Sequence, residues 1–271
     1  MAKGYVLGNQ DNEIARLEVQ ATFFEPLTKQ TLLNAGVKKG MSCIDIGCGS
    51  GSVTRLMAKM VGETGHVVGV DVDKRYLQYC NRSIVTSRQN IEFIYDDICN
   101  SQIDDKERFD IVYSRFTFHH LTDRRKAVRS MKRLKKNGGI IMIQDLDHAP
   151  GSWLCYPANK VVDKLRKVYV ALIKKRGGDP QVGRKLYKLL IDESLSTSVD
   201  CYSPCILMGQ EPYSSLGWQL AKSIKSQILD HGLQSEQEYN EMYEGLRRLA
   251  KDKRTFVTYS RLFSAIGRNS E

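Results

Sequence analysis

A glycine-rich segment, CIDIGCGSG at residues 43–51, has the residue types and spacing of a ligand-binding turn. Glycines at positions 47, 49 and 51 let a backbone turn tightly after an apolar strand, and they leave room for a ligand where a Cβ atom would otherwise stand. The dinucleotide fingerprint G-x-G-x-x-G requires a glycine at the position occupied here by Ser52. The segment therefore predicts a close approach of a ligand, without the third glycine of a pyrophosphate site.

Acidic residues follow the next two predicted strands. Asp71 ends the run VVGVDV, and Asp96 and Asp97 follow the run IEFIY. An acid at the end of the second strand can accept both hydroxyls of a ribose, and an acid after the third can meet an adenine amino group beside the apolar Ile98. Each acid alone could simply cap the following helix. Together, at the carboxyl edge where open α/β sheets bind ligands, they predict a nucleoside site.

The elements that must position these residues alternate along residues 41–146. Short runs rich in β-branched residues are separated by helical stretches, the pattern of right-handed crossover units that build a parallel sheet. We expect one domain with an α/β core and helical insertions. Its expected parts are a helical cap at 1–35 that breaks or restarts at Pro26, a cofactor-binding core at 36–149, a helical lid at 150–198 and 210–253, and closing strands at 199–207 and 255–267.

The net charge of +10 is concentrated in one stretch of the chain. Residues 123–190 hold 18 basic and five acidic residues, so the remainder is slightly acidic. Eight of the basic residues belong to the helix predicted between the fourth and fifth strands, where we expect a solvated face on the flank of the sheet. The other ten lie in 151–190, on the predicted lid, where they could attract an anionic substrate.

Composition and cysteine use narrow the class of protein. A hydrophobic share of 41% with 27% charged residues is typical of a soluble globular chain. No apolar run approaches the ~18–20 residues that span a bilayer, and the N-terminus is polar, so we expect neither membrane insertion nor secretion. The seven cysteines are scattered and include no C-x-x-C pair, which predicts a reducing, cytoplasmic location and no zinc site.

Five segments follow the order of a known set of motifs: DIGCGSG, GVDVD, YDDI, FDIVYSRFTFHHL and LKKNGGIIMIQD. Through them, residues 36–147 resemble a class I S-adenosylmethionine-dependent methyltransferase. The ending His119-His120-Leu121 and the N-terminal pattern Glu13-x-x-Arg16-Leu17-x-x-Gln20 resemble the type-11/25 small-molecule branch, related to ubiquinone and menaquinone biosynthesis enzymes. The resemblance implies a Rossmann-like, doubly wound sheet of seven strands, mostly parallel with an antiparallel last strand. It also implies S-adenosylmethionine as cofactor, S-adenosylhomocysteine as product and no metal.

The resemblance implies contacts to the methionine end of the cofactor. Gly47 and Gly49 lie against this part, while Asp45 organises the loop and orients the amino group. Ser114 and Arg115, at the end of the fourth strand, lie beside the same moiety, with Arg115 contributing its backbone.

A second set of implied contacts holds the adenosine end. Asp71 binds the ribose, Val72 and Ile98 sandwich the adenine, and Asp97 reaches the adenine amino group in a role that Asp96 can share. Two residues of the N-terminal cap close over the cofactor, Tyr5 and Gln20.

Methyl transfer from a sulfonium demands mainly positioning and the exclusion of water. A hydroxyl, phenol or carbon acid as acceptor would benefit from a base, for which His119 is the candidate, while we expect His120 to be structural. We expect transfer to a small molecule by in-line displacement. The alternative is an RNA or protein methyltransferase that uses the basic lid. The chain lacks both the Asn/Asp-Pro-Pro-Tyr motif of base-amino enzymes and a recognisable RNA-binding module, so nucleic acid is the less expected partner.

Overall fold

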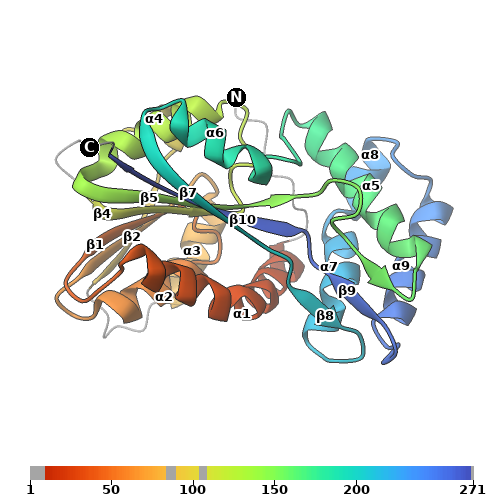
Figure 1. Ribbon diagram of the computed structural model, residues 1–271. Helices are drawn as coiled ribbons and strands as arrows, with labels where there is room; N and C mark the ends of the chain where they lie inside the picture. Colours follow the sequence, from red (N-terminus) through yellow and green to blue (C-terminus); the bar gives the residue numbers. More distant parts are fainter. Residues whose placement is uncertain (1–9, 84–89, 104–108, 270–271) are drawn as a thin grey trace.

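The computed structural model describes residues 10–83, 90–103 and 109–269 (Figure 1). Within these ranges seven strands form one sheet in the order β3-β2-β1-β4-β5-β10-β7. Their bounds are β1 Ser42–Ile46, β2 His66–Asp71, β3 Ile91–Tyr95, β4 Phe109–Arg115, β5 Lys135–Asp147, β7 Leu195–Tyr202 and β10 Arg261–Asn269. Strands β1 to β5 run parallel, whereas β10 is antiparallel to both of its neighbours. The predicted Rossmann-like sheet with an antiparallel last strand is confirmed.

The strand order reverses beside β1, which lies between β2 and β4. Successive crossovers leave this point in opposite directions, so the loops after β1 and β4 diverge and open a crevice at the carboxyl ends of the strands. The glycine-rich turn and Arg115 both lie at this point of the sheet.

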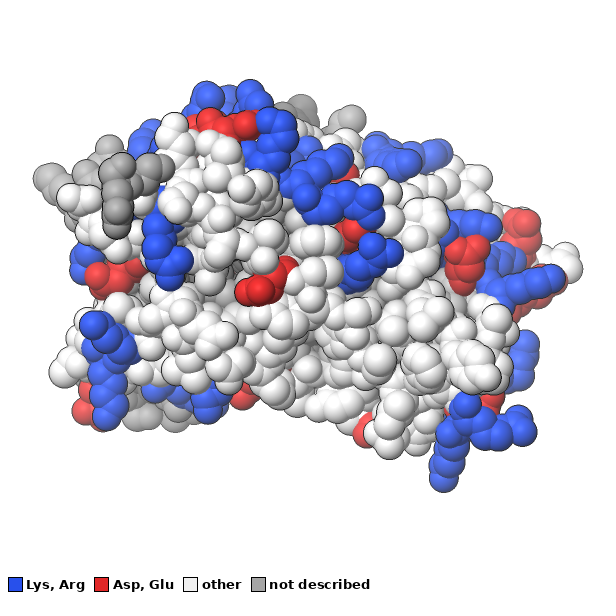
Figure 2. All heavy atoms as spheres, in the orientation of Figure 1, with Lys and Arg blue, Asp and Glu red and all other residues white. Residues whose placement is uncertain are grey.

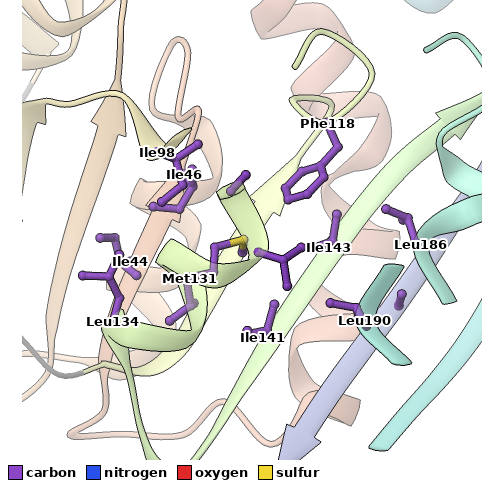
Figure 3. Close-up of a cluster of buried hydrophobic side chains, with 14 of the residues drawn as sticks. Ile44, Ile46, Ile98, Phe118, Met131, Leu134, Ile141, Ile143, Leu186 and Leu190 are labelled. Atoms are coloured by element: carbon purple, nitrogen blue, oxygen red, sulfur yellow. The ribbon is translucent and has the colours of Figure 1, made fainter. Parts of the chain in front are cut away.

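Helices cover the two faces of the sheet. On one face α1 (Gln10–Ala35) and α2 (Ser52–Val61) bury Leu32, Leu56 and Met57 against β1, β4 and β5. On the other, α4 (Arg124–Leu134) and α6 (Leu186–Ile191) pack on the apolar side chains of the same strands. Figure 3 shows Met131 of α4 and Leu190 of α6 in this second core. Helix α3 (Lys74–Ser83) connects β2 to β3.

Helix α1 is continuous through Pro26, so the predicted break at this residue is wrong. A proline inside a helix lacks the N–H that would bond the carbonyl four residues earlier, here that of Thr22. Both Thr22 and Pro26 are exposed, so water can satisfy that carbonyl. The face of α1 that packs on the protein, including the fully buried Phe24, is undisturbed.

A lid stands at one end of the sheet, on the right in Figure 1. It consists of α5 (Lys160–Lys175), α7 (Leu216–Ser223), α8 (Lys225–Asp230), α9 (Glu236–Leu249) and a small sheet of β6 (Cys155–Tyr156), β9 (Phe256–Thr258) and β8 (Cys205–Leu207). Buried side chains of the four helices form a hydrophobic core of their own, with Leu172 and Ile228 fully enclosed. Helix α1 contacts α7, which brings the N-terminal cap against the lid.

The structure corrects three of the expected boundaries. Each predicted closing strand is divided, because the chain passes from the main sheet to the small one at Pro204 and at Tyr259-Ser260. Proline cannot donate to a ladder, and the Pro204 carbonyl instead accepts from the Tyr259 N–H at 2.7 Å. Helix α6, predicted as part of the lid, instead packs on a face of the main sheet. Its Leu186 and Leu190 belong to the core that includes Ile141 and Ile143 of β5.

Candidate active site

A cleft of about 800 Å³ lies at the switch point of the sheet. Its floor is the glycine-rich turn after β1 and the residues after β4, and α1 and the lid form its other walls. The predicted site residues Gln20, Asp45, Gly47, Gly49, Arg115 and His119 all line this cleft. The cleft is therefore the place where the sequence motifs converge.

The glycine turn is held by backbone hydrogen bonds. Gly47 and Cys48 both donate to the Val70 carbonyl of β2, at 2.8 and 2.9 Å. Gly47 has a φ of +73°, and a Cβ atom there would lie 2.2 Å from the Thr117 hydroxyl, so no other residue fits without a rearrangement. Gly49, at φ +52°, faces space that only Leu17 approaches, at 3.9 Å. The turn thus presents bare backbone to the cleft.

Asp71 links this turn to the end of β2. Its carboxylate accepts from the Gly49 N–H at 2.8 Å and from the Asp73 N–H at 2.9 Å. Burial raises the pKa of Asp71, and backbone donors from Asp73, Gly49 and Val72 partly offset this. An ionised carboxylate has about four acceptor positions, so it keeps capacity for a ribose hydroxyl.

Asp45 is fully buried at the base of the cleft and accepts from the Thr54 hydroxyl at 2.7 Å. Burial raises the pKa of Asp45 to about 6, although the bond from Thr54 and the charge of Arg115 oppose the shift. A carboxylate with such a pKa changes its charge close to neutral pH, so the stability of the fold should depend on pH in this range.

We expect the Asp45→Asn variant to remove a pH-dependent component of stability. Because the folded protein binds this proton more tightly than the unfolded chain, Asp45 stabilises the fold at low pH, and that contribution disappears as the pH rises through about 6. Between pH 5 and 7.5 the loss amounts to about 1.4 kcal/mol. Urea unfolding of both proteins at the two pH values measures it. A difference between wild type and variant that does not change with pH would refute the assignment.

The acids after β3 have separate tasks. Asp96 is buried and holds its own loop, accepting from the Ser101 hydroxyl at 2.5 Å and from the Gln102 N–H at 3.1 Å. Asp97 is only partly buried and holds the short turn that follows, accepting from the Cys99 N–H and from the Asn100 amide, each at 2.9 Å. Asp97 is thus the more exposed of the two acids, and its contact with adenine stays a prediction.

Four predicted adenosine contacts lie along the same sheet edge but outside the lining of the cleft: Asp71, Val72, Asp97 and Ile98. Val72 is 47% exposed and follows the buried Asp71. Ile98 is buried in the core under α4. That the adenosine end of the cofactor lies along these residues, toward β3, stays a prediction.

Ser114 and Arg115 end β4 in different ways. The Ser114 hydroxyl is buried and donates to the Ile46 carbonyl at 2.9 Å, so it ties β4 to β1 rather than facing the cleft. The Arg115 side chain lines the cleft and donates to the Thr28 hydroxyl of α1 at 2.7 Å. Arg115 was expected to contribute its backbone, whereas the structure also places its cation at the site.

Helix α1 contributes a polar face to the cleft. Gln20 donates to the Tyr259 hydroxyl at 2.5 Å, which connects α1 to the C-terminal part of the chain. Arg16 is buried in the cleft wall with Glu13, with an N–O distance of 2.6 Å. Burial alone would lower the pKa of Arg16, but the Glu13 carboxylate raises it, so the guanidinium stays charged. Tyr5 lies outside the described residues.

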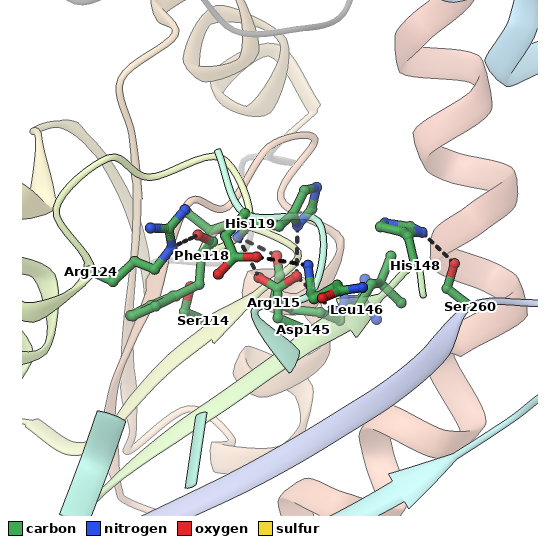
Figure 4. A network of polar contacts seen from close by, with 12 residues as sticks. Ser114, Arg115, Phe118, His119, Arg124, Asp145, Leu146, His148 and Ser260 are labelled. Atoms are coloured by element: carbon green, nitrogen blue, oxygen red, sulfur yellow. Dashed lines mark hydrogen bonds and ion pairs between the residues drawn. The ribbon is translucent and has the colours of Figure 1, made fainter. Parts of the chain in front are cut away.

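His119 is held by a buried acid. Its Nδ1 lies 2.6 Å from Asp145 Oδ1, and the Asp145 carboxylate also accepts from the backbone N–H groups of His119 and Leu146 (Figure 4). A carboxylate so engaged acts as an acceptor, so Nδ1 carries the proton and Nε2 has a free lone pair in the neutral ring. Nε2 is buried and finds no hydrogen-bond partner among the described residues. His119 thus lines the cleft and carries an unpaired, buried acceptor atom.

A second histidine in the cleft has the opposite tautomer. His148 Nδ1 lies 2.6 Å from the Ser260 hydroxyl and also accepts from the Trp153 indole at 3.2 Å, so its proton is on Nε2. Burial lowers the pKa of His148 well below its usual range, which keeps the ring neutral. The ring centroids of His119 and His148 are 6.0 Å apart. The cleft therefore contains a base and a neighbouring N–H donor.

Sequence reasoning missed several cleft residues: Phe116, His148, Tyr169, Leu220 and Tyr259. His148 follows QDLD at the carboxyl end of β5, a position where polar residues can signal a site. Tyr259 and Leu220 carry no local signal, because only the folding of the lid brings them beside α1. His120, expected to be structural, has a pKa lowered well below its usual range by burial and by His119.

The basic residues of the stretch 123–190 do not line the cleft. Helix α5 buries an apolar face that includes Leu165 and Leu172, so Lys167 and Lys174 are exposed on its outer side. On α4, Arg129 is exposed and pairs with Glu193 at 3.0 Å. Figure 2 shows Lys and Arg side chains along the upper edge of this face, over α4 and α6, with a largely uncharged region below them.

In residues 10–83, 90–103 and 109–269, no group of three or more His, Cys, Asp or Glu side chains could hold a metal ion. No helix there is both long enough and apolar enough to cross a membrane.

Comparison with known proteins identifies the family. Residues 37–188 match the family described as a methyltransferase domain. The demethylmenaquinone methyltransferase of Staphylococcus aureus strain MRSA252 is 31% identical over 114 residues, which cover 42% of this chain and 46% of the relative. The match thus spans less than half the length of this curated relative.

Solved structures share the fold at low sequence identity. The YcgJ protein of Bacillus subtilis has a TM-score of 0.57 at 20% identity, over 89% of this chain and 97% of that chain. Phosphoethanolamine N-methyltransferase 2 of Haemonchus contortus, solved with S-adenosyl-L-methionine, has a TM-score of 0.55 at 17% identity, over 90% and 52% of the two chains. The chain belongs to the methyltransferase family, in its class I, S-adenosylmethionine-dependent branch.

The residues present fit this cofactor. The bare backbone at Gly49 leaves space where a side chain would block a ligand. The spare acceptor positions of Asp71 suit ribose hydroxyls, and the exposed Val72 beside it suits the face of a base. At the other end, Asp45 and Arg115 offer opposite charges to an amino acid moiety.

Proposed function

We propose that this enzyme methylates a small organic molecule in the cleft, and that His119 removes a proton from the acceptor. The observation that carries the proposal is the buried His119–Asp145 pair: His119 lines the cleft, and its Nε2 has no hydrogen-bond partner among the described residues. An acid that orients an imidazole and fixes its tautomer is the usual arrangement for a general base.

When bound, S-adenosylmethionine supplies a methyl group already activated on a sulfonium. The cofactor would give this methyl to the acceptor atom and leave as the neutral thioether S-adenosylhomocysteine. The proton of the acceptor passes to His119 Nε2, and the imidazolium so formed is stabilised by Asp145. The Nε2–H group of His148 can donate to an acceptor oxygen and orient it.

The walls of the cleft favour a small acceptor over a polymer. The N-terminal cap and the lid meet over the cleft, through Gln20 and Tyr259, so a bulky polymer would have to displace them. The exposed lysines of α5 lie on the outer side of the lid. The relative that methylates demethylmenaquinone supports a small acceptor with a hydroxyl-bearing or carbon-acid ring. An anionic acceptor, which the basic lid suggested, stays a prediction.

A transfer experiment tests this proposal. The enzyme is incubated with methyl-tritiated S-adenosylmethionine and, separately, with phenols, naphthols and naphthoquinols, with structured RNA, and with total protein. We expect label in the organic-extractable product of at least one small acceptor and none above background in RNA or protein. Label confined to RNA or protein would overturn the proposal and favour the alternative that uses the basic lid.

A further inference from the structure

A second cavity lies in the lid and adjoins the cleft. It is lined by residues of α5, α7, α9 and the small sheet. Trp153, Leu220 and Tyr259 line both spaces and form a wall that the two share. We call this second space the lid cavity.

The lid cavity is lined by apolar side chains. No residue among the described ones that line it carries a charge; its members include Val162, Leu165, Ile206, Met208, Leu216, Leu246, Leu249 and Val257. The polar atoms of the shared wall are already bonded, since the Trp153 indole donates to Ser260 and the Tyr259 hydroxyl accepts from Gln20. These two residues therefore offer the lid cavity aromatic carbon. Protein interiors are normally close-packed, with few voids larger than a water molecule, so an uncharged, largely apolar space beside the cleft suits an apolar ligand.

One polar group in the lining has no partner. The Ser214 hydroxyl is buried, the residue being 4% exposed, and finds no hydrogen-bond partner in the described parts of the chain. Buried hydroxyls are usually bonded, because leaving one unpaired costs stability. Ser214 lines the lid cavity, where an oxygen or N–H group of a ligand would satisfy it.

We propose that the lid cavity binds the apolar body of the methyl acceptor. This inference rests on the proposed function, because the same molecule places its reacting group at His119 and its body in the lid cavity, beside Trp153, Leu220 and Tyr259. The body of the acceptor is accordingly lipophilic and uncharged, with one hydrogen-bonding group near Ser214. The absence of charge in the lining disfavours a charged group in this space.

The test uses the neutral dye N-phenyl-1-naphthylamine, whose fluorescence rises in apolar surroundings. Gly217 lines the lid cavity on α7, and a Cβ atom added there would lie 3.7 Å from Leu246, an ordinary contact. The Gly217→Phe variant thus fills the lid cavity from a helix that tolerates a side chain. The matched control is Asn240→Phe, on the exposed side of α9.

We expect the wild-type enzyme and Asn240→Phe to bind the dye alike, and Gly217→Phe to bind it at least tenfold more weakly. Thermal unfolding checks that both variants fold. No binding by the wild type, or equal binding by a folded Gly217→Phe, would overturn the inference. Because the dye reports binding without methyl transfer, failure here leaves the small-molecule proposal standing, whereas label in RNA or protein alone would refute that proposal by itself.

A second variant guards against misfolding of the first. Ser214→Ala removes the unpaired hydroxyl and adds no volume. We expect its affinity for 1-naphthol, measured by calorimetry, to fall several-fold relative to the wild type. Unchanged affinity for 1-naphthol would show that Ser214 does not contact the ligand and would contradict its assigned role.

Discussion

Replacing His119 by Asn is expected to lower the rate of methyl transfer by about 10²–10⁴-fold, the usual contribution of a general base. Asparagine can keep a hydrogen bond to Asp145, but it has no atom that can accept a proton at the position of Nε2. The assay uses the small acceptor that takes up most label from methyl-tritiated S-adenosylmethionine. Binding of S-adenosylhomocysteine should change by less than a few fold, because none of the cofactor contacts assigned to the turn after β1 is removed.

The pH dependence separates a base from a merely structural residue. Where the pH is high enough to ionise the acceptor in solution, the deficit of His119→Asn should shrink, since the proton is already lost. Asp145→Asn should cause a comparable loss with the same trend, because an amide neither keeps the proton on Nδ1 nor stabilises the imidazolium. A His119→Asn enzyme within tenfold of the wild-type rate, or a deficit equal at all pH values, would contradict the assignment.

Much of the core could be predicted from the sequence because its signals are local. The alternation of β-rich and helical runs specifies a parallel sheet, and the handedness of crossovers leaves few arrangements of its strands. The glycines at 47, 49 and 51 mark the turn, since each has a positive φ. Asp71 could be singled out from the sequence because it stands at the end of the second strand, β2.

The lid could not be predicted in the same way. Its small sheet joins strands from residues 155, 205 and 256 onward, which are far apart in the chain. The periodicity of α6 is that of any amphipathic helix, and nothing in it says which apolar surface it will cover. Leu186 and Leu190 pack on the main sheet because the folded core offers apolar side chains of β5 for them to cover.

The pairings between side chains around the cleft could not be predicted from the sequence either. His119 is visible as a polar residue after β4, but its acid partner lies 26 residues later, on β5. Gln20 and Tyr259, separated by 239 residues, meet only because α1 packs on the lid. Pairings of this kind depend on tertiary packing, and the sequence pattern near each residue does not contain them.

Replacing Asp71 by Ala is expected to weaken cofactor binding by about 100-fold or more. The variant loses the acceptor for two ribose hydroxyls, and hydrogen bonds to a charged group are each worth about 1.5–3 kcal/mol. It also frees the Gly49 N–H, so the turn that faces the methionine end is less well ordered. Asp73→Ala is the matched control, since its carboxylate pairs with Arg75 rather than with the turn.

Calorimetric titration of S-adenosylhomocysteine into the wild type, Asp71→Ala and Asp73→Ala tests most directly whether this edge of the sheet holds the cofactor. We predict tight binding to the wild type, nearly the same affinity for Asp73→Ala, and no measurable heat for a folded Asp71→Ala. An affinity of Asp71→Ala within threefold of the wild type would contradict the location of the site.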